Sequence, residues 1–349
     1  MMDRARKRSR VNYAMPSLPL HPLGTTSLQV SPIGLGLAAL GRPGYINLGH
    51  AEDLERDYAV QQMESKAHEV LDAAYEEGIR YFDAARSYGK AEAFLASWLV
   101  TKSSEELADI VVGSKWGYTY TADWQIDAEE HEVKEHSIEN LEKQWQESKD
   151  ILGNHLNLYQ IHSATLETGV LENRPILEKL AELKANGTHI GLSLSGEKQA
   201  QTLEKALDVQ VGGEKLFDTV QVTFNVLEPS AGETLARAHD EGLGVIVKEA
   251  LANGRLTERN DAPAFADKLK VLQKQTKRLD TTLDALALAF VLRQPWAGVV
   301  LSGAATAEHI RSNVKAVGLE LDEEALGALE ELREAPGEYW GTRGDLAWR

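Results

Sequence analysis

The chain has 349 residues, of which 43% are hydrophobic, and this is enough apolar material for one large core or two ordinary ones. Its formal net charge of −17 would repel a phosphate backbone on average, which argues against nucleic acid as a partner. The absence of cysteine excludes disulfides, thiolate nucleophiles and cysteine-ligated zinc, and no apolar run approaches the roughly 20 residues that a membrane span needs.

The first ten residues include five basic side chains, and no apolar stretch follows them. This is not the pattern of a secretory signal, and the expected location is the cytoplasm. We expect residues 1–16 to form a disordered basic tail and residues 17–349 to form a single domain.

From residue 65 onward, short apolar strands alternate with amphipathic helices. The segment 23–30 precedes this pattern and is predicted to form a hairpin that closes the bottom of a barrel. The predicted strands cover residues 31–36, 80–83, 110–115, 157–162, 189–193, 218–223, 244–248 and 298–302. One predicted helix ends at Gly78. The other predicted helices cover residues 90–100, 131–152, 174–186, 197–208, 230–241, about 283–290 and 306–317, and a further helical stretch is predicted near 265–275.

Strands separated by helical patterns of this length indicate parallel βαβ units. Eight such strands without a linker-like break predict a single (β/α)8 barrel, with long loops at the C-terminal face and an aromatic tail at 338–349 that folds over the mouth. The segment Gly34–Ala39 approximates the G-x-G-x-x-A fingerprint of a Rossmann fold. Because Gly41 to Gly44 break the chain where a helix would have to begin, we treat that match as accidental.

Four polar residues follow consecutive strand ends: Asp83, Tyr88, Lys115 and His162. In a barrel these ends converge on one face, so the four side chains are expected to form one proton-transfer site. An ammonium beside a phenol lowers the pKa of the phenol, and a carboxylate keeps that ammonium charged. Such a site protonates an oxygen, whereas the hydride that reduces a carbon has to come from a cofactor. Each residue alone is also compatible with a structural role, such as a buried ion pair or a packed aromatic.

The segment 82–92, together with Lys115 and His162 at the following strand ends, resembles the aldo-keto reductase superfamily over roughly residues 22–318. The resemblance implies that Tyr88 is the general acid, that Lys115 and Asp83 tune it, and that His162 orients the carbonyl. It also implies an extended nicotinamide cofactor bound without a Rossmann fold. NADPH or NADP+ is favoured by the family, and NADH is possible. No metal is expected.

The same resemblance implies a set of cofactor contacts along the barrel mouth. They are Gly36, Leu37, Ser193, Gln221, Lys248, Leu251, Asn253, Gly254, Arg255, Gly303, Ala304, Thr306, His309 and Asn313. Lys248 departs from the aromatic residue that the family usually places against the nicotinamide, and Leu194 departs from a common asparagine. Ala305 and His309 stand where Arg or Lys often meets a 2′-phosphate, which leaves His309, Arg311 and Arg255 as candidates for that contact.

We expect Ala38, Trp116 and Trp124 to contact a small carbonyl or sugar substrate. Three alternatives to carbonyl reduction remain. The enzyme could oxidise a sugar with NAD(P)+, the protein could be a non-catalytic subunit that senses the cofactor, or the barrel could bind phosphate and carry out other chemistry.

Overall fold

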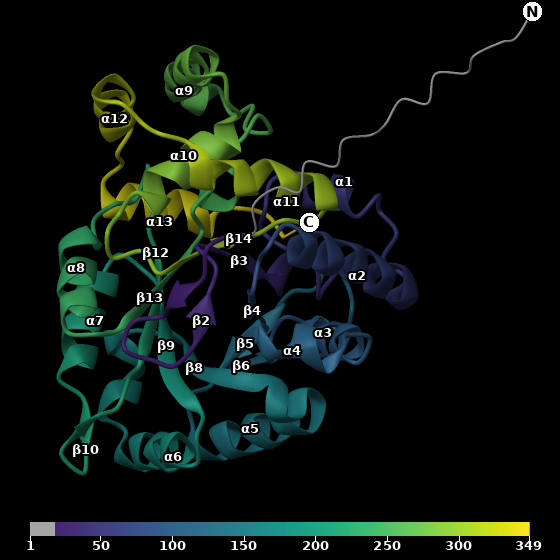
Figure 1. Ribbon diagram of the computed structural model, residues 1–349, viewed down its shortest axis with the longest axis vertical. Coiled ribbons are helices and arrows are strands. Elements are labelled where there is room, and N and C mark those ends of the chain that lie inside the picture. The colour runs from purple at the N-terminus through teal and green to yellow at the C-terminus, as the bar shows by residue number, and fades with distance from the viewer. Residues whose placement is uncertain (1–17, 349) are drawn as a thin grey trace, which may run out of the picture.

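Eight parallel strands close into a barrel that helices surround (Figure 1). The structure is a computed structural model that describes residues 18–348, so the expected basic tail lies outside the described residues. Around the barrel the strands follow the order β12, β13, β14, β3, β4, β5, β8 and β9, and β9 pairs with β12 to complete the closure. Their bounds are β3 Ile33–Gly36, β4 Tyr81–Asp83, β5 Val111–Trp116, β8 Leu156–Ala164, β9 His189–Leu194, β12 Thr219–Thr223, β13 Gly244–Lys248 and β14 Val299–Ser302. The predicted (β/α)8 fold is confirmed.

The outer helices bury one face against the strands, as their apolar spacing predicts. In α2, for example, Met63, Ala67, Val70, Leu71 and Ala74 are buried. The helices that follow barrel strands are α2 Val60–Glu76, α3 Ala91–Leu99, α5 Ile138–Leu152, α6 Arg174–Ala185, α7 Gln199–Leu207, α8 Gly232–Asp240, α10 Leu283–Leu292 and α11 Ala307–Asn313. The additional helices are α1 His50–Asp53, α4 Ser104–Ala108, α9 Ala266–Leu279, α12 Glu323–Glu330 and α13 Pro336–Gly344. None of the helices within residues 18–348 is long and apolar enough to cross a bilayer.

A hairpin closes the barrel at the end where the strands begin. Its strands β1 (His21–Pro22) and β2 (Gln29–Val30) pair antiparallel, and Leu23 between them is fully buried. Leu23 packs with barrel residues such as Tyr81 and Ile246 in a separate apolar cluster. The backbone approaches so closely that a Cβ on Gly244 would lie 2.6 Å from Cγ of Leu23. The expected plug is therefore present.

The predicted helix over 131–152 is wrong at its start. The strand β7 (Glu132–Lys134) pairs antiparallel with β6 (Tyr118–Tyr120), and the helix α5 begins only at Ile138. The side chain of Ser137 accepts a hydrogen bond from the backbone N–H of Asn140 and so caps the helix at this point. The predicted helix 306–317 likewise ends at Asn313 and continues as a tighter turn over Val314–Gly318.

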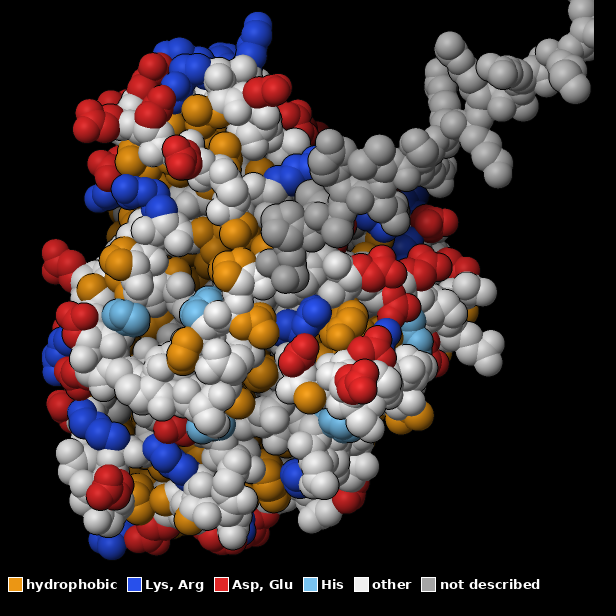
Figure 2. Space-filling view, in the orientation of Figure 1, with side chains coloured by type: hydrophobic (Ala, Val, Ile, Leu, Met, Phe, Trp, Pro, Cys, Tyr) orange, Lys and Arg blue, Asp and Glu red, His pale blue; other side chains and the backbone are white. Residues whose placement is uncertain are grey.

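The long segment after β13 carries α9, which lies beside α12 at the top of the view (Figure 1). Basic side chains gather over this part of the surface (Figure 2). Two of them bind acidic residues at the start of α12: Arg278 pairs with Asp322 at 2.6 Å and Lys274 pairs with Glu324 at 3.4 Å. These ion pairs fasten α9 to the C-terminal part of the chain.

Candidate active site

The ends of three neighbouring strands bring the predicted catalytic residues together. Asp83 ends β4, Lys115 lies near the end of β5, His162 lies near the end of β8, and Tyr88 follows in the loop between β4 and α3. Nζ of Lys115 lies 3.5 Å from the hydroxyl of Tyr88, and the rings of Tyr88 and His162 meet edge to face with centroids 5.5 Å apart. The four side chains therefore form one cluster at the barrel mouth, as the strand order predicts.

Lys115 and Asp83 form a buried ion pair beneath Tyr88. The side chain of Lys115 is fully buried and that of Asp83 is 2% exposed, and the ammonium also donates to the carbonyl of Ala84 at 2.9 Å. The second oxygen of Asp83 accepts hydrogen bonds from Gln221 at 2.9 Å and from the hydroxyl of Tyr81 at 3.2 Å. Buried charges are stable only when paired and hydrogen-bonded in this way, so the position of Nζ is strongly fixed.

A bulge in β8 presents His162 to the cluster. The register with β9 shifts between Ile161 and Ala164, and Ser163 adopts a left-handed φ of +52°. The hydroxyl of Ser193 accepts the backbone N–H of Ser163 at 2.8 Å, and Nε2 of His136 bonds to the carbonyl of His162 at 2.9 Å. These two contacts hold the bulge in place and thereby set the direction of the His162 ring.

The protonation states follow from burial. Burial, and then the negative charge of Asp83, raise the pKa of Tyr88 well above its usual value, while Arg42 acts in the opposite direction. The net shift is therefore opposite in direction to the lowering that the sequence predicts from a neighbouring ammonium, because burial and Asp83 raise the pKa. Burial also lowers the pKa of Lys115, and burial together with the nearby Lys115 lowers the pKa of His162 well below its usual value. The cluster thus presents a protonated phenol and a neutral imidazole.

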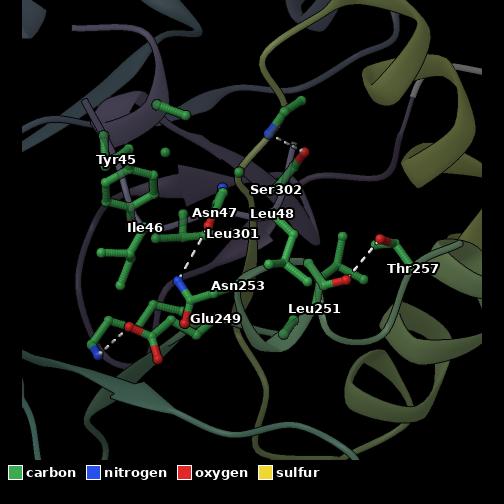
Figure 3. A pocket seen from close by; sticks show the side chains of 18 of the residues that line it. Tyr45, Ile46, Asn47, Leu48, Glu249, Leu251, Asn253, Thr257, Leu301 and Ser302 are labelled. Atoms are coloured by element: carbon green, nitrogen blue, oxygen red, sulfur yellow. Dashed lines mark hydrogen bonds and ion pairs between the residues drawn. The ribbon is translucent and has the colours of Figure 1, made fainter. Parts of the chain in front are cut away.

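A long cavity of about 680 Å³ begins at this cluster. The end beside this cluster is lined by Arg42, Tyr45, Tyr118 and Trp348. Arg42 lies over the rings of Tyr88 and Tyr45, with its guanidinium 5.1 and 5.0 Å from their centroids. Figure 3 shows how the lining continues from Tyr45 and Glu249, past Asn47 and Asn253, toward Thr257. The cavity is therefore elongated along the mouth of the barrel.

Two loops meet across the middle of this cavity, one at residues 47–48 and the other at Asn253, and together they form what we call the strap. The backbone N–H of Leu48 donates to the carbonyl of Asn253 at 3.0 Å, and the side chains of Asn47 and Asn253 bond at 3.2 Å. The Oδ1 atom of Asn253 is buried without a hydrogen-bond partner among the described residues. A buried amide oxygen in this state calls for a donor from a ligand or water.

The middle of the cavity fits an extended dinucleotide. Gly36, Gly254 and Gly303 line it, and because they have no side chain a ligand can come close to the backbone there. The unpaired Asn253 oxygen lies in the same wall, and the length of the cavity leaves room for a ring beside Tyr88 and a second ring at the other end.

Most of the predicted cofactor residues lie in the cavity wall. They are Gly36, Gln221, Lys248, Leu251, Asn253, Gly254, Gly303, Ala304, His309 and Asn313, joined by the predicted substrate residue Ala38.

Several predicted residues lie outside the wall. Leu37 and Trp116 are fully buried in the core, and Thr306 caps α11. Nε1 of Trp124 donates to the carbonyl of Tyr58 at 2.7 Å, and its ring packs on Phe94. The predicted substrate residues Trp116 and Trp124 thus lie outside the cavity wall. Side chains alternate along β5, so Trp116 points to the opposite side of the strand from Lys115.

Two further cofactor candidates are engaged elsewhere. Nη1 and Nη2 of Arg255 donate to the two carboxylate oxygens of Glu334, at 2.9 and 2.6 Å, in a buried pair. Ser193 is fully buried and supports the bulge at Ser163.

The sequence did not single out five residues that shape the cavity. They are Arg42, Tyr45, Asp53, Arg259 and Arg343. All five lie on loops or helix ends, where no apolar period marks a position. Trp348 also lines the cavity, and it belongs to the aromatic tail that the sequence predicts to fold over the mouth. The clearest signal in the sequence is the broken segment Gly41–Gly44, because glycine and proline before a barrel helix indicate a shaped loop at the mouth.

A parallel barrel with a Tyr–Lys–Asp–His cluster at the mouth of a long cavity is an architecture typical of oxidoreductases that bind an extended dinucleotide. The model of the aldo/keto reductase family matches residues 32–334, and the chain belongs to that family. It is 25% identical over 340 residues to an NADH-specific methylglyoxal reductase of Escherichia coli, with 90% of this chain and 98% of the relative covered. It is 26% identical over 335 residues to the L-galactose dehydrogenase of Arabidopsis thaliana, with coverage of 92% and 96%.

The fold is also similar to that of solved structures. The holo form of the aldo-keto reductase AKR11C1 from Bacillus halodurans superposes with a TM-score of 0.68 at 22% sequence identity, covering 91% of this chain and 97% of that protein.

Proposed function

We propose that the protein reduces aldehydes or ketones to alcohols with a nicotinamide dinucleotide as hydride donor. The observation that carries the proposal is the phenol of Tyr88, 3.5 Å from an ammonium that Asp83 holds in place, beside the neutral His162 in the wall of a long cavity. Either NADPH, which the family resemblance favours, or NADH would fill this role.

In the proposed reaction the cofactor supplies the hydride, and the cluster of side chains supplies the proton and orients the substrate. When bound, a reduced nicotinamide supplies a hydride to the carbonyl carbon. Tyr88 then gives its proton to the carbonyl oxygen, and the phenolate that remains is stabilised by the ammonium of Lys115. A neutral His162 has one ring N–H, and donating it to the carbonyl oxygen fixes the direction of the substrate.

The wall residues have distinct roles in this proposal. Gln221 and Lys248 line the cavity near the cluster, where the nicotinamide would bind. Gly254, Asn253 and Leu251 would hold the pyrophosphate under the strap, and Gly303, Ala304 and Asn313 would contact the adenosine. Four of the predicted cofactor residues do not line the cavity and would instead support the segments that form its wall. They are Arg255, Ser193, Thr306 and Leu37.

A second candidate is the oxidation of a sugar, with Tyr88 as the base. It is favoured by the polar substrate end, where Arg42 and Glu132 pair at 2.8 Å and Arg343 pairs with Glu249 at 2.6 Å beside the aromatic rings of Tyr118 and Trp348. Paired charges of this kind can bind hydroxyl groups, and one relative carries the name L-galactose dehydrogenase. A non-catalytic role as a cofactor sensor would leave the complete cluster without use.

The test is a titration of NADPH and NADH by fluorescence, followed by assays of an aldehyde and ketone panel and of aldoses with the oxidised cofactors. The Tyr88→Phe variant should keep its cofactor affinity and lose at least about a thousandfold in turnover, because it retains the ring but has no proton to give. Turnover of Tyr88→Phe at the wild-type rate would contradict the mechanism. Faster turnover of aldoses than of any carbonyl would favour the second candidate.

A further inference from the structure

We infer that this chain binds NADH in preference to NADPH, and that Asp53 sets the preference by holding Arg259 away from the cofactor. The inference rests on the proposed function, since it concerns the adenosine end of the same cavity. It reverses the preference that the family resemblance favours.

The two ends of the cavity are distinct. Arg42 lies over both Tyr88 and Tyr45, so the end near Tyr45 is the catalytic one and takes the nicotinamide. The wall then passes under the strap to Thr257, which is near the right edge of Figure 3. The hydroxyl of Thr257 accepts the backbone N–H of Arg259, so Arg259 lies at the far end, where the adenosine of an extended dinucleotide would reach.

Carboxylates dominate this far end. Its wall includes Asp53, Glu258, Asp284 and Glu308. Of the described residues in this part of the wall, the basic ones are Arg259 and His309, and burial lowers the pKa of His309, which is therefore neutral at pH 7. This part of the wall thus carries one charged guanidinium and four carboxylates.

That guanidinium is already engaged. Nη1 of Arg259 binds Oδ2 of Asp53 at 2.6 Å, and Nη2 binds the other carboxylate oxygen. Nη1 also donates to the carbonyl of Gly49 at 3.1 Å, and Nη2 lies 3.3 Å from Nε2 of His309. The side chain of Asp53 is only 9% exposed, so this pair is partly shielded from water and is stronger than an exposed one.

The other two cations that the sequence predicts for a 2′-phosphate, Arg255 and Arg311, do not line the cavity. Arg255 is held by both oxygens of Glu334 behind the wall. The nearest acidic oxygen to Arg311 is on Glu77, at 3.9 Å, and Arg311 does not line the cavity. A 2′-phosphate would therefore meet no free cation among the described residues of this wall.

The chemistry of the two cofactors differs at this one position. A phosphate monoester carries a charge of about −1.5 to −2 at neutral pH, and four nearby carboxylates repel it. The 2′-hydroxyl of NADH is neutral and can donate a hydrogen bond to a carboxylate, which is how acidic residues select NAD in other dinucleotide sites. The charge distribution thus favours the cofactor without the phosphate.

The experiment measures the dissociation constants of NADH and NADPH by isothermal titration calorimetry. We expect the wild type to bind NADH at least about tenfold more tightly. Asp53→Ala releases Arg259 and removes one carboxylate, so the affinity ratio should shift toward NADPH by about tenfold. The double variant Asp53→Ala/Arg259→Ala should lose most of that shift. Glu55→Ala, a loss of the same charge at an exposed nearby position, should leave the ratio close to the wild-type value.

A second measurement needs no variant. If the far end repels the 2′-phosphate, added salt screens the repulsion and improves NADPH binding relative to NADH; if a free cation bound the phosphate, added salt would weaken NADPH binding. The inference is overturned if the wild type prefers NADPH, if its NADPH affinity falls relative to NADH with salt, or if a folded Asp53→Ala keeps the wild-type ratio. Binding of neither cofactor would instead overturn the proposed function.

Discussion

Lys248 occupies the end of β13, where the family resemblance leads one to expect an aromatic ring. Its ammonium donates to the hydroxyl of Thr223 at 2.7 Å, lies 3.6 Å from a carboxylate oxygen of Glu249, and lies 5.9 Å from the ring centroid of Trp340. Burial lowers the pKa of Lys248 to about 8, with Glu249 acting in the opposite direction. The side chain is therefore mostly charged at neutral pH and loses its proton as the pH rises through about 8.

This charge should act on the redox state of the cofactor. An ammonium disfavours the cationic ring of an oxidised nicotinamide but not the neutral ring of a reduced one. As the pH rises through about 8, we expect the oxidised cofactor to bind several-fold more tightly relative to the reduced one, because Lys248 becomes neutral. Lys248→Met should show the higher ratio at all pH values.

Binding titrations with both redox states across this range check the prediction about Lys248. Lys198→Met, at an exposed ion pair away from the cavity, serves as the control. An unchanged affinity ratio in Lys248→Met would contradict the role assigned to the charge.

Among the elements, the C-terminal helix α13 is fastened across the end of the cavity where we propose that the substrate binds. Arg343 binds Glu249 through Nη2 at 2.6 Å and Nε at 3.0 Å, and Asn225 donates to the hydroxyl of Tyr339 at 3.0 Å. Past the end of α13, Trp348 stacks on His131 with the ring centroids 4.2 Å apart. The expected folding of the aromatic tail over the mouth is thus found in its described part, and it places Arg343 and Trp348 in the cavity wall.

Loosening α13 should affect the substrate and spare the cofactor. Arg343→Met leaves the buried Glu249 without its main partner, which disfavours the present position of the helix. We expect KM for the carbonyl substrate to rise by about tenfold, because wall contacts at the substrate end are lost, and the cofactor dissociation constant to change little. Steady-state kinetics and cofactor titrations measure the two effects.

The control for α13 is Arg333→Met, since Arg333 is exposed and lies 3.9 Å from its nearest acidic oxygen. Equal losses of substrate and cofactor affinity in Arg343→Met would show that α13 has a general structural role instead.

The N-terminal hairpin acts at the opposite end of the barrel and should matter for stability alone. Leu23 is fully buried, so Leu23→Ala should reduce the free energy of unfolding by about 2–5 kcal/mol, because it leaves a cavity between the plug and the strands. Turnover of the folded variant should remain at the wild-type level. Urea unfolding measures the first quantity, and Leu20→Ala, at a residue that is 43% exposed, is the matched control. A loss of turnover in folded Leu23→Ala would contradict the separation of the two ends.

The elements differ in how well the sequence predicts them. The eight barrel strands are short apolar runs between glycine and polar turns, and all eight are confirmed within one or two residues at most ends. The sequence predicts a helix over 131–137, yet tertiary pairing with β6 makes part of this segment a strand. Pairing with a distant partner overrides local preference, and a single sequence does not show the partner.

At the scale of the whole molecule, the barrel topology explains why the sequence predicts the Asp83, Tyr88, Lys115 and His162 cluster, but only part of the cavity wall. Strand ends converge by geometry, so Asp83, Lys115 and His162 could be brought together from their order alone. Arg42, Arg259 and Trp348 come from loops and from the tail, and their places depend on ion pairs and ring contacts that have no periodic signal. The bulge at Ser163 is equally hidden, since the residue is not a glycine.

The whole molecule should also lose stability in mild acid through its buried histidines. Burial lowers the pKa of both His50 and His136 to about 4, below the 6.5 of an exposed imidazole. Between these two values the unfolded chain binds protons that the folded chain does not, so the free energy of unfolding falls as the pH falls and is fully present above about 6.5. His162 acts in the same direction.

Each of the two histidines should cost about 2 kcal/mol of folding free energy on going from about pH 7.5 to about pH 5. Urea unfolding at these two pH values measures the loss. His136→Gln keeps a side-chain donor near the carbonyl of His162 but has no proton to gain, so its pH-dependent loss should be smaller than that of the wild type by this amount. His239→Gln changes an exposed imidazole at the end of α8 and should reproduce the wild-type dependence. Identical pH dependence in the His136 variant and the wild type would show that the imidazole of His136 takes up its proton equally well in the folded and the unfolded chain.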